Sequence, residues 1–345
     1  MACAGGIVKD GLQRIEYFDA LRGIAIIMVV AIHVFGSVYT GETVSFFGVA
    51  LRQIMQCAVP IFCASSAFFL GRKVLDCKEE YFSFLKKQIP RVYIPCLACA
   101  LPYLVMDFSN GNFFKPVLKF FSCSYSILYF VVLIIQFYIL LPFIKRSKIF
   151  KNVRVAATIS ALWAAAYTYV LSRIMGISLP LILYAAPIFC FGVHFAVGLR
   201  YAENKPFGSS KIWIILAVIF WILSIGESYH LMNGSLSGSG LKPSAVLFSI
   251  AAVILLYSNS FRQYFNGKKW TRVFSFLGCY SFGIYLTHIF ILMFFKKMNY
   301  IPFLVEKFGT DIAWGAVISA LCINVIFLAT AKKLMPKISR WCFGV

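Results

Sequence analysis

An apolar segment near the start of the chain carries three ionisable side chains, and it constrains the fold more than any other feature. Residues 18–33 read FDALRGIAIIMVVAIH, which is apolar enough to enter a lipid bilayer as a helix. Arg22 and His33 are eleven positions apart, which at about 100° per residue places them on one face, with His33 roughly 16 Å deeper. Asp19 lies one turn before Arg22. Ionisable groups at such depth are costly, so we expect this face to be functional.

The composition places the whole chain in a membrane. Of its 345 residues, 61% are hydrophobic and only 13% are charged, and the mean hydropathy is +0.84. Soluble domains of this length carry far more charge. Because the loops are short, we predict one all-α, polytopic domain over residues 1–345, with no soluble domain appended. The ten predicted transmembrane helices lie near residues 18–38, 46–70, 92–107, 127–144, 155–172, 181–199, 211–229, 244–260, 274–295 and 311–331.

The net charge of +21 is explained by membrane topology rather than by nucleic-acid binding. With both termini in the cytoplasm, 25 of the 33 basic residues fall on the cytoplasmic side of the ten spans. This asymmetry satisfies the positive-inside rule. The short-looped architecture favours a bacterial inner (cytoplasmic) membrane, so we expect a multi-pass protein in contact with membrane lipid and without a nucleic-acid partner. The eleven cysteines form no paired metal motif, so no metal is expected.

The ionisable side chains of the first span each have a functional and a structural interpretation. A neutral imidazole can accept a proton from a hydroxyl, which makes His33 a candidate catalytic residue. The alternative is a histidine that forms a hydrogen bond with a neighbouring helix. Arg22 keeps its charge and suits an anionic ligand. The alternative is that its side chain reaches the headgroups, alone or paired with Asp19.

A second group of charges precedes the third span. The basic connection 71–91 ends in the sequence KKQIPR, in which Lys87 and Arg91 could bind phosphate groups. The alternative, which is stronger for Lys87, is ordinary anchoring at the cytoplasmic surface.

Polar side chains also occur inside three other spans. In the ninth span, Tyr285 and His288 are one turn apart and either contact a ligand or form interhelical hydrogen bonds. Glu227, late in the seventh span, either receives a sugar hydroxyl or lies at the membrane interface. Ser66 lies in the small-residue run ASSA of the second span, which would let helices approach closely. A nucleophilic role for Ser66 lacks the G-x-S-x-G elbow.

Five segments, in order between residues 17 and 288, resemble motifs of the acyltransferase-3 family of integral membrane acyltransferases. The first is YFDALRGIA through His33, which is similar to the family's D-x-x-R-G-x-A opening and its Arg-x(10)-His signature. Three positions depart from the family pattern, because Gln88 replaces an arginine, Ala67 a glycine and Tyr129 a tryptophan. The other four segments are Pro60–Ser66, Arg91–Pro95, Tyr129–Pro142 and Tyr280–His288.

The resemblance implies transfer of an acyl group, most often acetyl, from cytoplasmic acyl-CoA to a hydroxyl of a sugar in a surface polysaccharide or its precursor. His33 would be the catalytic residue, either as a general base in direct transfer or as the carrier of the acyl group. Asp19 would be the charge partner of Arg22. Acetyl-CoA would be held by Arg22, Arg91 and Lys87, and the sugar or polysaccharide acceptor by Ser66, Glu227, Tyr285 and His288.

Two other classes of protein compete with the enzyme. A transporter or flippase of a lipid-linked sugar would also need polar groups among its spans, but the sequence shows no internal repeat of the kind many transporters carry. A sensory or scaffold protein would use the same polar residues to join its helices. The acyl group, acetyl or succinyl, and the acceptor stay open at this stage.

Overall fold

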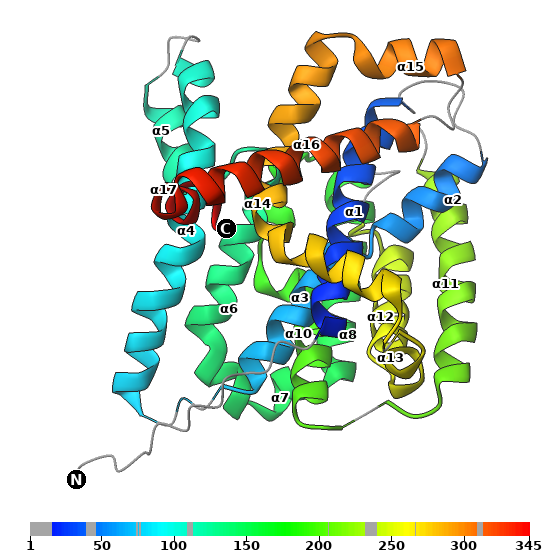
Figure 1. Cartoon of the computed structure of the whole chain (residues 1–345). Coiled ribbons are helices and arrows are strands. Elements are labelled where there is room, and N and C mark those ends of the chain that lie inside the picture. Colours follow the sequence, from blue (N-terminus) through cyan, green and yellow to red (C-terminus); the bar gives the residue numbers. More distant parts are fainter. Residues whose placement is uncertain are drawn as a thin grey trace.

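The computed structural model describes residues 16–38, 46–108 except 74 and 76, 113–231 except 206, 240–308 except 266, and 313–345. Within these ranges the chain is helical and contains no strand (Figure 1). The helices are α1 (Glu16–Val38), α2 (Phe46–Met55), α3 (Ala58–Gly71), α4 (Lys78–Phe108), α5 (Phe114–Phe121), η1 (Ser126–Leu128), α6 (Tyr129–Arg146), α7 (Lys148–Lys151), α8 (Val153–Ala165), η2 (Ala166–Ile174), α9 (Leu181–Tyr184), α10 (Ile188–Ala202), α11 (Ser210–His230), α12 (Pro243–Leu256), α13 (Asn259–Phe265), α14 (Lys269–Lys297), α15 (Tyr300–Phe308), α16 (Ala313–Leu334) and α17 (Pro336–Phe343).

The predicted all-α, polytopic architecture is confirmed. In the described part of the chain, eight helical segments are long and apolar enough to cross a bilayer, and α12 with α13 forms a ninth that is bent by 62°. The short apolar helix α10 matches the remaining predicted span, so each of the ten predicted segments overlaps a helix. The cytoplasmic placement of the termini stays a prediction.

The third predicted span begins earlier than expected. The sequence analysis placed a basic connection up to residue 91, whereas α4 is a single helix of 31 residues that starts at Lys78. Proline lacks the backbone donor of a helix interior, yet α4 contains Pro90, Pro95 and Pro102. The helix continues through Pro90, which puts Lys87 and Arg91 one turn apart on the same rigid element.

A very close helix contact joins α1 to α14. A Cβ atom on Gly23 would overlap the carbonyl oxygen of Phe274, and a Cβ atom on Gly278 would overlap that of Asp19. The two backbones therefore touch, as in small-residue contacts of membrane helices. Figure 1 shows the oblique α14 crossing α1. Beyond the crossing, the two helices stay in contact along their lengths.

A second close contact joins α3 to α10. A Cβ atom on Gly198 would overlap the carbonyl oxygen of Ala64 and lie 2.7 Å from the Cβ of Ala67. The small residues of the second span thus allow the close approach that the sequence predicted.

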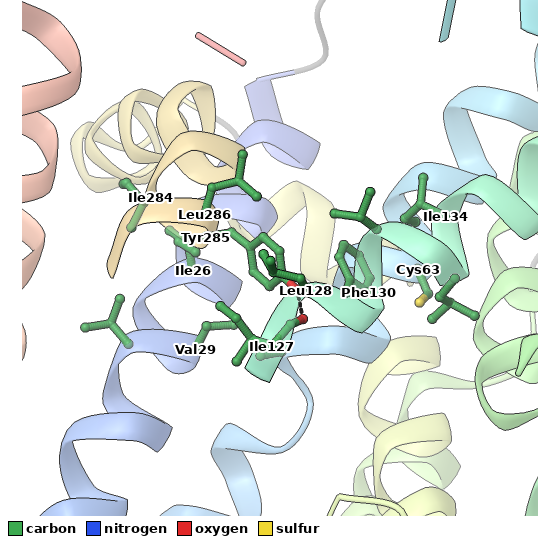
Figure 2. Packing of buried hydrophobic residues seen from close by; sticks show 14 of the residues in the cluster. Ile26, Val29, Cys63, Ile127, Leu128, Phe130, Ile134, Ile284, Tyr285 and Leu286 are labelled. Carbon is green, nitrogen blue, oxygen red and sulfur yellow. Dashed lines mark hydrogen bonds between the residues drawn. The ribbon is translucent and has the colours of Figure 1, made fainter. Parts of the chain in front are cut away.

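Buried apolar side chains of α1, α6 and α14 meet in the centre of the bundle. Figure 2 shows Ile26 and Val29 of α1 near Ile127 and Leu128 of η1, with Tyr285 of α14 between these elements. The Tyr285 hydroxyl donates a hydrogen bond to the carbonyl oxygen of Ile127. The core therefore fixes α14 to the start of α6 by a polar contact as well as by packing.

The α1–α14 contact predicts the effect of adding one methyl group. Gly23→Ala should lower the free energy of unfolding by about 1–3 kcal/mol, because a Cβ atom has no room between the two backbones. Thermal unfolding of the purified protein in detergent measures the effect. Gly36→Ala on the same helix is the matched control, since a Cβ atom there meets nothing within 4 Å. Equal stability of the two variants would contradict the described crossing.

Candidate active site

A cavity of about 270 Å³ lies beside the end of α1 that is remote from Arg22. His33, half-buried on α1, and Tyr285 on α14 are two of its walls. Arg52 and Gln56 enter it from the region where α2 ends, and Gly240 and Leu241 close it from the segment before α12. Its remaining walls are Val29, Ile32, Val59, Ile127, Tyr129, Phe130, Leu181, Tyr184, Ala185 and Phe191. The cavity is slightly smaller than most small-molecule sites, which are about 300–1,000 Å³.

His33 has a second histidine beside it. The ring centroids of His33 and His288 are 5.3 Å apart, because the α1–α14 crossing brings the two helix faces together. His288 is fully buried, and its Nδ1 lies 3.0 Å from the carbonyl oxygen of Ile284 and 2.9 Å from that of Tyr285. Since both partners are acceptors, Nδ1 carries the hydrogen and donates it. Nε2 then bears a lone pair, and it has no hydrogen-bond partner among the described residues.

Tyr285 contributes its ring to the cavity. Its hydroxyl is occupied by the bond to Ile127, and its ring centroid lies 5.5 Å from that of Phe130 and 6.3 Å from that of His288 (Figure 2). Tyr285 is therefore held in place as an aromatic wall next to the two histidines.

A basic cluster, defined as Arg22, Lys73, Lys87 and Arg91, lies at the other end of the site. Burial and the neighbouring charges of Lys87 and Arg91 lower the pKa of Lys73 below its ordinary value. Tyr138 on α6 is within electrostatic reach of both Arg22 and Arg91. The structure therefore brings together the three cations that the sequence singled out for an anionic ligand, and adds Lys73 to them.

Arg22 is tethered inside the basic cluster. Its Nη1 lies 3.2 Å from Oδ1 of the buried Asp19, and its guanidinium lies 4.8 Å from the ring centroid of Phe69. The helix α1 runs unbroken from Glu16 to Val38, so Arg22 and His33 are separated by roughly 16 Å of helix rise. The basic cluster and the two histidines are thus two ends of one site.

Two predicted acceptor residues lie apart from the cavity. Glu227 accepts a hydrogen bond of 2.5 Å from the Tyr169 hydroxyl, one of 3.0 Å from the Ser244 backbone N–H, and one from the Ser244 hydroxyl. Its carboxylate thereby ties the start of α12 to the π-helical segment η2. Ser66 is half-buried on α3 and, like Glu227, is not among the cavity-lining residues.

Lys242 lies beside Glu227 at the start of α12. Its side chain has no exposed surface, and its ammonium donates a hydrogen bond to the Ser228 hydroxyl. Burial lowers the pKa of Lys242 from 10.5 to about 7, with Arg52 acting in the same direction and Glu227 opposing. The protein therefore holds an ammonium group here at a cost in stability.

Sequence reasoning missed Arg52. It was counted as one of the basic residues of the outer surface, whereas the structure places it on the cavity wall with a buried Nε. The sequence does contain a feature that singles out Arg52, because it is the lone cation of the otherwise largely apolar residues 46–71. The break after Met55, where the chain turns between α2 and α3, decides which way Arg52 points.

In the described ranges, no group of three or more His, Cys, Asp or Glu side chains is arranged to hold a metal ion.

Comparison with known proteins yields one family and one relative. The acyltransferase domain described as acyltransferase-3 matches residues 15–331. A Bacillus subtilis (strain 168) protein named "Putative membrane-bound acyltransferase YfiQ" is 23% identical over 304 residues, which cover 81% of this chain and 82% of that protein. No solved structure matches the chain at a significant level.

The buried Lys242 predicts a pH-dependent stability. Between about pH 7 and pH 10 the unfolded chain keeps the lysine proton that the folded protein releases, so the stability of the wild type should rise with pH in this window. Lys242→Met should be the more stable protein near pH 7, and this advantage should shrink towards pH 10. Ser228 stays bonded in the variant, because its hydroxyl donates to the carbonyl oxygen of Ser224 at 2.9 Å. The midpoints of thermal unfolding of the two proteins, measured from pH 6.5 to 9.5, test this. A difference that is constant across pH would contradict it.

Proposed function

Because the chain belongs to the acyltransferase-3 family, we propose that it transfers an acetyl group from acyl-CoA to a hydroxyl of a sugar in a surface polysaccharide or its precursor. Family membership makes the protein a membrane acyltransferase, and it favours chemistry over the transport alternative. The observation that carries the finer proposal is the arrangement along α1. A basic cluster lies at one end and a cavity-lining histidine lies at the other.

The basic cluster suits the nucleotide end of CoA. The phosphates of CoA are multiply anionic, and guanidinium groups bind phosphate oxygens in pairs. Arg91 and Lys87 lie one turn apart on α4, with Arg22 and Lys73 facing the same region. The long, thin pantetheine arm would then follow α1 and bring the thioester towards His33. Lys87, with Lys73 within electrostatic reach of it, would supply the charge of the family arginine that Gln88 replaces.

His33 would accept the proton of the acceptor hydroxyl. In direct transfer, the hydroxyl oxygen attacks the thioester carbonyl carbon, the proton passes to His33, the C–S bond breaks, and the proton moves on to the CoA thiolate. In the covalent route, a ring nitrogen of His33 attacks the thioester carbonyl carbon and the C–S bond breaks, so that CoA leaves as its thiolate. The acceptor hydroxyl oxygen then attacks the acetyl carbon, the N–C bond to His33 breaks, and the hydroxyl proton neutralises the thiolate. Mass spectrometry of the protein quenched after mixing with acetyl-CoA separates these routes, since only the second leaves an acetylated His33.

His288 would orient His33. The lone pair on its Nε2 can accept a hydrogen bond from one ring nitrogen of His33, which leaves the other ring nitrogen unprotonated for the acceptor. His288 is in this scheme a positioning residue, and its own orientation is fixed by the Ile284 and Tyr285 carbonyl groups.

Loss of the imidazole tests the role of His33. His33→Ala should reduce acetyl transfer by about 10²–10⁴-fold, the usual contribution of a general base, while acetyl-CoA still binds at the basic cluster. The rate of acetyl transfer is measured as hydrolysis or transfer of radiolabelled acetyl-CoA by protein in nanodiscs. The affinity for acetyl-CoA is measured by equilibrium binding. Near-normal transfer by His33→Ala would refute the proposed mechanism.

Removal of a cation tests the donor site. Arg91→Ala should weaken acetyl-CoA binding about tenfold or more, because a charge-assisted hydrogen bond to phosphate is lost. Lys86→Ala is the matched control, since Lys86 is an exposed cation on the same helix outside the basic cluster. Isothermal titration of both variants with acetyl-CoA gives the comparison. Equal weakening by the two substitutions would indicate a general charge effect and contradict a defined phosphate site.

A further inference from the structure

Arg52 is a charged residue of the cavity that the proposed mechanism does not use. It lies on α2, beside the end of α1 that is remote from Arg22 (Figure 1), and it lines the same cavity as His33. The Nε atom of Arg52 is buried and has no hydrogen-bond partner among the described residues. Among the described residues that line the cavity, Arg52 carries the only full charge, and none is Asp or Glu.

The Arg52 side chain is half-buried, and its buried Nε is the atom that lacks a hydrogen-bond partner among the described residues. Removing a charge from water costs several kcal/mol unless an opposite charge and hydrogen bonds replace the water. The nearby carboxylate of Glu227 does not serve this purpose, because Tyr169 and Ser244 occupy it and Lys242 is its cationic neighbour. Lys242 instead adds a second positive charge within electrostatic reach of Arg52. An anionic ligand in the cavity would supply the missing partner.

The position of Arg52 assigns this anion to the acceptor and not to CoA. The basic cluster, which suits the phosphates of CoA, lies roughly 16 Å of α1 away from His33, whereas Arg52 lines the same cavity as His33 and does not belong to that cluster. The surfaces around Arg52 also suit a sugar. Tyr129 and Tyr184 offer aromatic faces, and Tyr184 is held by a stacked Tyr167 at a centroid distance of 4.3 Å.

The wall next to Arg52 is tightly built. A Cβ atom on Gly240 would lie 2.7 Å from Oε1 of Gln56, so the backbone at Gly240 packs directly on the Gln56 side chain. Gln56 lies one turn after Arg52, and both line the cavity. The subsite therefore combines a guanidinium, an amide and two tyrosine rings.

We propose that Arg52 binds an anionic group of the acceptor, a carboxylate or a phosphate carried by the sugar, so that the enzyme acylates an acidic saccharide. This inference rests on the proposed function, since it assigns the anion to the acceptor. The planar guanidinium binds carboxylate or phosphate oxygens through paired N–H groups, which would hold the sugar in one orientation in the cavity that His33 lines.

Small sugars test the subsite without any need for turnover. The probes are D-glucuronate, D-glucose 6-phosphate and neutral D-glucose, titrated at equal ionic strength into protein in nanodiscs and followed by saturation-transfer difference NMR. The wild type should bind at least one anionic probe about tenfold or more tightly than D-glucose, because charged hydrogen bonds are the strong ones. The carboxylate and phosphate probes show which anion the subsite accepts.

Matched variants assign the preference to Arg52. Arg52→Gln should remove the preference for the anionic probe, and Arg52→Lys, which keeps the charge in a folded protein, should retain part of it. Arg173→Gln removes an exposed arginine elsewhere and should keep the full preference.

Several results would overturn the proposal. These are equal binding of all three probes by the wild type, a preference that survives Arg52→Gln, and a preference that Arg173→Gln abolishes as well. A slower acetyl-CoA hydrolysis in Arg52→Gln with unchanged anion preference would place Arg52 at the reacting carbonyl instead. A different result would refute the proposed function itself. In that case the wild type would neither bind nor hydrolyse acetyl-CoA, whatever sugars it binds.

Discussion

The contact between the backbones of α1 and α14 is the constraint on which the site depends. Gly23 and Gly278 leave no space for a side chain, so the two helices cross at a fixed point and angle. In a membrane the interior of the bundle gains little from excluding lipid, and close packing of small residues has to fix the helix positions. His33 and His288 lie further along the same two helices, and the crossing brings their ring centroids to 5.3 Å. Two histidines far apart in the chain become one unit because two glycines let their helices touch.

Electrostatics divides the molecule into two regions with different partners. At one end, four cations gather with one buried carboxylate, Asp19, which is paired with Arg22. At the other end, Lys242 is buried, Arg52 is half-buried with a buried Nε, and the nearby carboxylate of Glu227 is bonded to Tyr169 and Ser244. Neutral histidines and aromatic rings lie between these regions. Such a distribution suits a protein that receives one anionic ligand from each side and joins them in the middle.

Helix periodicity was sufficient to find part of this site from the sequence. The common face of Asp19, Arg22 and His33 depends only on positions within one helix, and so does the spacing of Tyr285 and His288, so local geometry predicts both. The ten apolar segments were likewise visible, because hydropathy is a local property. The direction of Arg52 depends on the turn between α2 and α3, and the partners of Glu227 come from η2 and α12, so neither could be read from spacing. The start of α4 at Lys78 was likewise not visible, because the basic stretch before residue 92 lacks the apolar signal of a span.

The unbroken course of α1 has a consequence for how this site can evolve. Because Arg22 and His33 belong to one continuous helix, the distance between them is set by peptide geometry and does not depend on how the other helices pack. Substitutions elsewhere in the bundle can therefore alter the acceptor side of the cavity while the span between the two groups stays constant. Length changes within this segment have no such freedom, because one inserted residue would turn His33 by about 100° away from His288. The rise of α1 therefore fixes the separation of Arg22 and His33 independently of the residues around the cavity.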